Sequence, residues 1–423
     1  MKLILKKRFR ESFARKRHLC LHSNDQVKAR NMKKLIYTLL VWRYKHGKEN
    51  IKINKVLKVA IVHYLYLVCI DEDQCKISRP IRTLNTLITN FTESQCNLYF
   101  RFRKTELTSL LHLLRFPDKM ILSNRCSMQG EEVLLRGLYE LVAGERQITI
   151  SDKVFGRENT QQSRAFSCFI DHIYTNFHHL VHDNLNWWHI TGLMEVSAKA
   201  IKDKLRFIAE GCEFVDAPDV AHLIDCNCNP TSVCGGGPAE SGANSARWDD
   251  RIQRSFYNGW KSIHGLKHQT VDNAFGMTVD MYGPASVRRN DLELLRLSNI
   301  NDRMVALTNH IIFGDSAYKP RSRVRSYYHA DEENPIANFV RWNAAMKKIR
   351  ISIEWNYGYT ATLFRYICNK QKLKILGSDK VMKVYTVATL FRNFHIAAYG
   401  GQTSNYFNLT TNFLAAYINQ TDL

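Results

Sequence analysis

The stretch Val220-Ala221-His222-Leu223-Ile224-Asp225 decides the fold class, because a short apolar run suited to a buried strand ends on a carboxylate. The run Ile311-Ile312-Phe313-Gly314-Asp315 repeats this arrangement further along the chain. A third acidic residue, Glu354, closes the stretch Arg350-Ile351-Ser352-Ile353-Glu354, which has helical character. Two carboxylates at strand ends and a third on a later helix can converge on one pocket. Three hard oxygen donors of this kind suit divalent cations such as Mg²⁺.

The chemistry that such a pocket favours is metal-assisted phosphodiester cleavage. Two metal ions about 4 Å apart can activate an attacking oxygen and stabilise the leaving oxygen of an in-line displacement. A single Asp at a strand end is more often an ordinary turn or cap residue. The prediction therefore depends on Asp225, Asp315 and Glu354 occurring together and in this order.

The order of elements around these acids predicts a ribonuclease H-like α/β core with a mixed sheet and flanking helices. Patterns of apolar and polar residues place strands at 220–224, 267–271, 277–281 and 310–313. A helix is predicted from Asn290-Asp291 to Leu297, and longer helices over 336–367 and 379–399. A three-strand meander followed by a helix, a strand and a long helix is the succession expected of that core.

Residues 97–200 predict an all-α region that contains a helix-turn-helix. Apolar residues recur at helical spacing over 106–114 and 131–142. A short helix over 148–155 can end at Gly156, and Asn159 or Thr160 can cap a second helix. The polar residues at the start of that second helix would contact DNA bases: Gln161, Gln162 and Arg164. An ordinary helical hairpin is the alternative.

Charge indicates a polyanionic partner, and double-stranded DNA is the first candidate. The chain of 423 residues has a net charge of +21, and residues 1–50 carry +12 of it. This basic arm could also be a nuclear import signal or plain solvated surface. The most apolar stretch, 56–70, is shorter than the roughly twenty residues of a bilayer crossing, so no membrane partner is expected.

Cysteine usage predicts reduced thiols and no zinc site. The 11 cysteines are irregularly spaced, as expected inside the cell. Cys226, Cys228 and Cys234 lie near His222, but their spacing lacks the paired knuckles of structural zinc sites, so zinc is not expected. The segment 235–238 is glycine-rich without the Gly-Lys-Ser/Thr of a nucleotide loop.

Several linked motifs in the second half of the chain carry a family resemblance. They are Ile224-Asp225, Phe256-Tyr257-Asn258-Gly259-Trp260-Lys261-Ser262-Ile263-His264-Gly265-Leu266-Lys267-His268-Gln269, Asn290-Asp291-Leu292, Gly314-Asp315-Ser316-Ala317-Tyr318, and Arg350 and Glu354 followed by Tyr357-Gly358 and Phe364-Arg365. With these motifs, residues 220–400 resemble the nuclease domain of PIF/Harbinger superfamily DDE transposases. The helical region near 100–180 resembles the helix-turn-helix segment that precedes this domain in the family.

The resemblance implies roles for particular residues. The catalytic and metal-binding triad would be Asp225, Asp315 and Glu354, holding two Mg²⁺ ions, with Mn²⁺ as a substitute. Two residues would support the site: Asp291, which could instead cap its helix, and Arg350, one turn before Glu354. A basic cluster would border the DNA: Lys261, His264, Lys267 and His268. Tyr257 and Trp260 could stack on bases or fill the core.

The resemblance also implies partners and a location. A nuclear transposase of this type cleaves transposon ends and transfers the freed 3′-hydroxyl to target DNA. Homo-oligomers on DNA and a separate Myb-like DNA-binding partner are expected. The run Cys226-Asn227-Cys228-Asn229-Pro230 departs from the Gly-Thr-His that follows the first Asp in many relatives. A catalytically silent, host-retained DNA-binding protein is therefore the alternative.

These inferences divide the chain into five parts. The predicted parts are a basic arm (1–50), a helical segment of unassigned role (51–96), the helix-turn-helix region (97–200), the nuclease domain (215–400) and a C-terminal tail (401–423).

Overall fold

The computed structural model describes residues 87–123, 125–145, 155, 159–214, 216–232, 254–330, 332, 336–375 and 380–421. The chain separates into two compact units, of which one contains residues 1–81 and 124–127 and the other contains the rest. Everything below except Ser127 belongs to the second unit. Several predicted features lie outside the described residues: the basic arm, most of 51–96, the helix proposed over 148–155 apart from Phe155, Cys234, and the segment 235–238.

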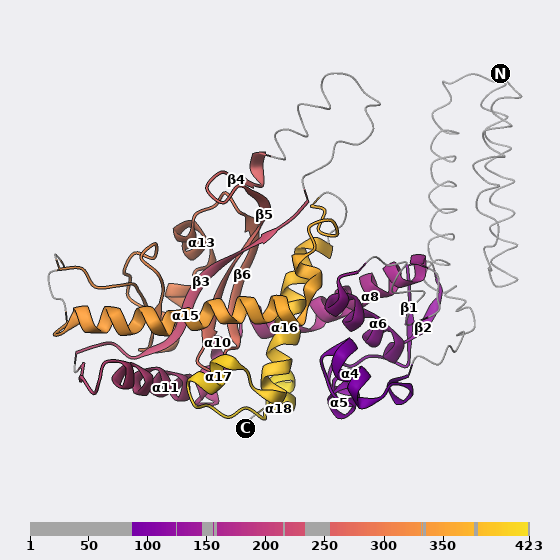
Figure 1. Cartoon of the computed structure of the whole chain (residues 1–423), viewed down its shortest axis with the longest axis horizontal. Helices are drawn as coiled ribbons and strands as arrows, with labels where there is room; N and C mark the ends of the chain where they lie inside the picture. Colours follow the sequence, from indigo (N-terminus) through magenta and orange to yellow (C-terminus); the bar gives the residue numbers. More distant parts are fainter. Residues whose placement is uncertain are drawn as a thin grey trace, which may run out of the picture. The chain divides into compact units, whose positions relative to one another are not determined.

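The centre of the described structure is a mixed sheet (Figure 1). Its main strands are β3 (Val220–Pro230), β5 (Ile263–Asn273), β6 (Thr278–Ser286) and β7 (Ile311–Phe313). β3 pairs antiparallel with β5, β5 pairs antiparallel with β6, and β7 lies parallel to the other edge of β3. Short strands extend the sheet: β4 (Tyr257–Asn258) pairs with β5, and β8 (Val324–Arg325) pairs with β7. The predicted three-strand meander and the mixed sheet are confirmed.

Helices cover the two faces of this sheet. Alternation along β3 and β7 places Leu223 and Phe313 in one core with α11 (Leu193–Ile208) and α15 (Phe339–Leu363). Figure 1 shows α15 crossing the sheet. Ile224 and Ile312 belong to the other core, together with apolar residues of α13 (Asp291–Ser298) and α14 (Ile300–Leu307). A strand with both faces buried reads as a continuous apolar run, which is the pattern of 220–224.

The amino-terminal part of this unit is mainly helical, but the short strands β1 (Lys119–Ile121) and β2 (Ser127–Gln129) pair within the region that was expected to be all-α. Its other elements are η1 (Ile88–Asn90), α4 (Glu93–Phe100), α5 (Lys104–Leu113), α6 (Gly130–Ala143), α8 (Asn159–Phe177), α9 (His179–His182) and α10 (Leu185–Ile190). α8 packs on α16 (Lys380–Tyr399), where the Phe169 and Phe391 rings stack with centroids 5.4 Å apart. The helices therefore share one apolar core with the sheet.

The helix-turn-helix is not confirmed. α8 supplies the predicted second helix, and its apolar residues Phe166, Phe169, Ile170 and Ile173 are buried as expected. The predicted first helix falls almost wholly outside the described residues.

The carboxyl-terminal residues differ from the expected tail. After η3 (Arg365–Cys368) and α16, the chain forms α17 (Gln402–Tyr406) and α18 (Leu414–Asn419). Tyr417 of α18 is fully buried, and its hydroxyl donates to the Leu180 carbonyl at 3.0 Å. This segment is therefore part of the folded unit. Among the described residues, no helix is long and apolar enough to cross a bilayer.

Candidate active site

Two of the three predicted carboxylates lie side by side on neighbouring strands, where β7 ends beside β3. Leu223 of β3 pairs with Phe313 of the parallel strand β7. Asp225 and Asp315 each follow their member of this pair by two residues. Neighbouring strands lie about 4.8 Å apart, so equal steps from a paired position keep the two aspartates close. The register of β3 and β7 thus brings together two acids that are far apart in the sequence.

The loop that carries Asp315 explains the Gly-Asp-Ser-Ala-Tyr motif. A Cβ at Gly314 would lie 2.5 Å from the Tyr318 ring and 2.9 Å from Ile224 Cγ2, so only glycine fits. The Ala317 amide donates to Asp315 Oδ1 at 2.9 Å, which fixes the carboxylate in a tight turn. Tyr318 is fully buried under the loop, with its hydroxyl 3.4 Å from Cys226 Sγ. Gly314, Ala317 and Tyr318 therefore hold the loop of Asp315 against β3.

Arg350 joins the first and third carboxylates. Its Nη1 donates to Asp225 Oδ2 at 3.0 Å, and its Nη2 donates to Glu354 Oε1 at 2.8 Å. The sequence predicted the contact with Glu354 from the spacing of one helical turn. It gave no signal for the contact with Asp225, because that depends on how α15 crosses β3. Asp225 and Glu354 therefore face the same cationic group.

The electrostatic setting of Asp225 is unusual for a carboxylate. Burial raises the pKa of Asp225 to about 6, although the hydrogen bond from the Cys226 amide and the charge of Arg350 lower it. The neighbouring Asp315 and Asp291 carboxylates raise the same pKa. A partly buried carboxylate crowded by other acids gains from a positive charge placed beside it.

The Asp291 carboxylate lies close enough to Asp225 to raise the pKa of Asp225. The Asn290 side chain caps α13 by accepting from the Glu293 amide at 2.7 Å, so Asp291 is not the cap. The Asp291 carboxylate accepts from Lys267 Nζ at 2.7 Å. Lys267 was predicted to border DNA, but it is buried against Asp291 and the Arg289 carbonyl.

The carboxylate oxygens of Asp225 and Asp315 are the donor type that a hard divalent cation prefers. Asp225 and Asp315 supply oxygens from adjacent strand ends, and the single guanidinium between Asp225 and Glu354 marks a position where a cation is stabilised. In the part of the chain that the structure describes, no three His, Cys, Asp or Glu side chains are gathered closely enough to hold a metal ion. Metal binding at these residues would therefore require Arg350 to give up a hydrogen bond to Asp225 or to Glu354.

The other members of the predicted basic cluster are in different surroundings. His268 is buried, stacks on Tyr385 with ring centroids 4.5 Å apart, and lies 3.1 Å from Asn229 Oδ1. Burial lowers the pKa of His268 to about 3, so the ring is neutral at physiological pH. Lys261 is exposed and His264 is half-buried against Tyr257. Only these last two remain available for DNA.

The residues that were predicted to contact DNA bases also differ in their exposure to solvent. Gln162 is fully buried, where its amide hydrogen-bonds Arg136 and Glu140 of α6, so it has no surface to offer a base. Gln161 and Arg164 are half-buried in the first turns of α8. A helical period places residues 161 and 162 on different faces, which a motif reading alone does not resolve.

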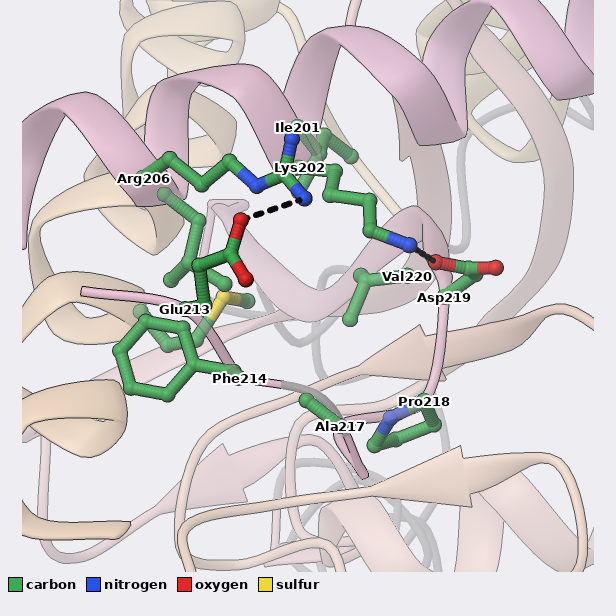
Figure 2. A pocket seen from close by; sticks show the side chains of 11 residues that line it. Ile201, Lys202, Arg206, Glu213, Phe214, Ala217, Pro218, Asp219 and Val220 are labelled. Atoms are coloured by element: carbon green, nitrogen blue, oxygen red, sulfur yellow. Dashed lines mark hydrogen bonds and ion pairs between the residues drawn. The ribbon is translucent and has the colours of Figure 1, made fainter. Parts of the chain in front are cut away.

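A cavity of about 260 Å³ lies at the opposite end of β3 from Asp225 (Figure 2). Its polar lining consists of two ion pairs: Lys202 with Asp219 at 2.8 Å, and Arg206 with Glu213 at 3.7 Å. Figure 2 shows Phe214 and Ala217 on its other side. Its charged groups are matched with each other, so it does not resemble the carboxylate cluster.

Comparison with known proteins gives one family match. No curated protein and no solved structure gives a significant match to the chain. Residues 245–393, about a third of the chain, match the family model described as DDE superfamily endonuclease. The matched segment contains Asp291, Asp315, Arg350 and Glu354, and it begins after Asp225. The match supports a nuclease of the DDE transposase type, for which the family implies a ribonuclease H-like fold.

Proposed function

We propose that this protein is a Harbinger-type DDE transposase, which cuts DNA at transposon ends and transfers the freed strand to target DNA. Its metal ligands would be Asp225, Asp315 and Glu354. One observation carries the proposal: the Arg350 guanidinium bridges Asp225 and Glu354 at the strand edge where Asp315 also lies. Two carboxylates held by one guanidinium, with a third at the end of the neighbouring strand, are the donor types that suit Mg²⁺ or Mn²⁺.

Each residue around the cluster has a definable task. When bound, divalent ions supply activation of the attacking oxygen and stabilisation of the leaving oxygen. Arg350 holds Asp225 and Glu354 in place and balances their charge before the ions arrive. The Lys267 ammonium holds Asp291 near the site and reduces its repulsion of Asp225. The Tyr357 hydroxyl, 2.8 Å from Thr270 Oγ1, supports the strand position opposite Asp225.

DNA binding would draw on other parts of the chain. The basic arm (1–50) supplies phosphate contacts, and Gln161 and Arg164 of α8 are the remaining candidates for base contacts. In this proposal the protein acts in the nucleus as a homo-oligomer on DNA, with a Myb-like protein assisting in end recognition.

A second function is a catalytically silent DNA-binding protein retained by its host. The ion pairs of Arg350 favour it, because they already neutralise two of the three carboxylates without a metal. The residues after Asp225 also have internal partners, since the Asn227 amide donates to the Tyr385 hydroxyl at 2.8 Å. Such a site could persist for its contribution to folding alone.

DNA cleavage by the purified full chain separates the two functions. The substrates are supercoiled plasmids that carry, or lack, the genomic segments flanking the coding region. We expect nicking that requires Mg²⁺ or Mn²⁺ and prefers the flanking segments. The Asp225→Asn variant should lose it by about a hundredfold or more, since it removes a metal ligand while keeping the shape. The matched control is Asp219→Asn, which alters an exposed acid at the other end of β3.

The outcomes are distinct. Equal nicking by wild type and Asp225→Asn would point to a contaminating nuclease and reject the assigned triad. Binding to DNA without metal-dependent nicking in any sample would reject the transposase activity in favour of the silent DNA-binding protein.

A further inference from the structure

The most exposed large apolar side chain among those that the structure describes belongs to Trp260. Its exposed fraction is 95%, compared with 78% for Phe207, the next in order. Indole is large and mostly apolar, and it is enriched where one molecule binds another. The expectation that Trp260 fills the core is therefore wrong, and its exposure needs an explanation.

Ordered backbone holds the indole in solvent. Trp260 lies in the turn between β4 and β5, where Tyr257 pairs with His264 and Asn258 pairs with Ile263. The Asn258 side chain accepts from the Lys261 amide at 3.0 Å and donates to the Val287 carbonyl at 2.8 Å. The turn is thus fastened internally and to the end of β6. A fixed hairpin presents Trp260 with little entropy to lose on binding.

The surroundings of Trp260 are basic. The segment 254–271 contains no acidic residue. Lys261 follows Trp260 directly, and Arg254 and Arg288 are exposed and joined by a hydrogen bond from Arg288 Nη1 to the Arg254 carbonyl at 3.3 Å. An exposed aromatic ring near exposed cations is the combination that binds single-stranded nucleic acid, with bases stacked on the ring and phosphates near the cations.

The hairpin lies near the carboxyl end of β3, beyond Asp225. Lys261 Nζ lies 3.5 Å from Cys228 Sγ, and Cys228 follows Asp225 by three residues on β3. At about 3.3 Å per residue, this places the Lys261 ammonium roughly 10 Å along the strand from Asp225. That span corresponds to about three base steps of duplex DNA at 3.4 Å each. Alternation puts the Cys228 and Asp225 side chains on opposite faces of β3, so the span is a separation along the strand, which DNA that contacts both groups has to cover.

We propose that Trp260 stacks on an unpaired base of the DNA, a few nucleotides from the phosphate bound at Asp225, Asp315 and Glu354. This inference rests on the proposed function, which it extends from the chemistry to the form of the substrate. Strand cleavage exposes bases that leave the duplex, and the indole holds one of them while Lys261 contacts the adjoining phosphate. The hairpin thus selects DNA that is frayed or branched beside the cut.

Binding of labelled DNA by the full chain tests this. The probe is one fluorescein-labelled duplex, used blunt and with a short single-stranded branch, titrated without divalent metal. We expect Trp260→Ala to lose about tenfold in affinity for the branched probe and less than threefold for the blunt one. Trp260→Phe should keep most of the affinity, and the matched control Phe207→Ala should bind as wild type. Since Trp260 is exposed, its variants should fold normally.

Ionic strength separates stacking from charge. In a plot of the logarithm of affinity against the logarithm of salt concentration, Trp260→Ala should leave the slope unchanged. Lys261→Ala should reduce the slope, on both probes, by the amount that corresponds to about one phosphate contact. Wild-type affinity of Trp260→Ala for both probes would overturn the inference, even if Mg²⁺-dependent nicking is found. A change in sedimentation of Trp260→Ala without a change in DNA affinity would overturn it in favour of a protein contact. Selective loss of the branched probe supports it even if no nicking occurs.

Discussion

An aspartate just before β3 and another in the middle of β3 each meet a basic residue of a covering helix, yet the two pairs differ in kind. At the amino end, Asp219 meets Lys202 of α11 at 2.8 Å, with both side chains about half exposed, at 48% and 47%. In the middle of the strand, just beyond the point where β7 ends, Asp225 meets Arg350 of α15 at 3.0 Å, with exposed fractions of 17% and 18%. The same type of ion pair thus occurs in an exposed setting and in a shielded setting along one strand.

The difference shows what makes a functional cluster. An exposed pair contributes little, since water screens it and two long side chains must be ordered. The pair of Asp225 and Arg350 is shielded, is shared with Glu354, and lies beside Asp315. The packing differs too: the amino end of β3 borders a cavity of about 260 Å³, whereas next to Asp225 there is no room for a Cβ on Gly314.

The packing contrast predicts the largest effect. Gly314→Ala places a methyl group 2.5 Å from the buried Tyr318 ring and 2.9 Å from Ile224, so we expect a loss of about 3 kcal/mol in the free energy of unfolding. At the other end, Ala217→Val extends into the cavity, and we expect unchanged stability or a gain of about 1 kcal/mol. Urea denaturation followed by circular dichroism measures both. Equal destabilisation by the two substitutions would remove the contrast.

The charge contrast predicts a smaller effect on stability. Arg350→Ala leaves Asp225 without its cation, and we expect a loss of about 2 kcal/mol, whereas Lys202→Ala should change stability by less than about 0.5 kcal/mol. Arg350→Ala should also tighten Mn²⁺ binding about tenfold, because the guanidinium no longer competes for two carboxylates. Electron paramagnetic resonance of free Mn²⁺ measures this. Weaker Mn²⁺ binding by the variant would instead mean that Arg350 organises the ligands.

A buried histidine near the amino end of β3 predicts a pH effect. His222 is fully buried with neither ring nitrogen hydrogen-bonded in the described structure, and burial lowers its pKa to about 3, helped by nearby His310. His310 itself is held by Glu195 at 2.6 Å. Unfolding returns the pKa of His222 to about 6.5, so the stability from neutral His222 is complete above pH 6.5 and is lost as pH falls towards 3.

The expected magnitude is about 1 kcal/mol between pH 7 and pH 5.5. His222→Leu should lack this share of the acid destabilisation, so its stability should fall less over the same range. Denaturation midpoints across pH for wild type and variant provide the measurement. Parallel pH profiles for the two proteins would show that His222 accepts a proton while folded.

The sequence predicted those parts of the fold that depend on local pattern. Apolar runs located the cores of β3, β5, β6 and β7, and helical periodicity located α5, α6, α13, α15 and α16. The extent of β3 to Pro230 was missed because Cys226 to Asn229 have no strand pattern, and their pairing with β5 decides it. α14 was missed because Asn299, in a left-handed conformation, separates it from α13.

The candidate site was predictable only where chain proximity or a motif marked it. Asp315 and Glu354 were accessible from their own motifs, and the link of Arg350 to Glu354 followed from helical spacing. The sequence did not predict which side chains of the basic segment are buried. Lys267 and His268 lie in a basic run, but a strand of the meander turns both into the interior, whereas the turn before them leaves Trp260 in solvent.

The hydrogen bonds that follow Asp225 have a consequence for inheritance. Asn227 donates to the Tyr385 hydroxyl of α16, and Asn229 contacts His268, whose ring stacks on the same tyrosine. These four residues, from β3, β5 and α16, therefore form one connected group of side chains beside the carboxylates. A change of any one leaves a buried polar group unmatched. Lineages that carry Gly-Thr-His after the first aspartate should thus also differ at the positions of His268 and Tyr385, and the strand and the helix should have diverged as a set.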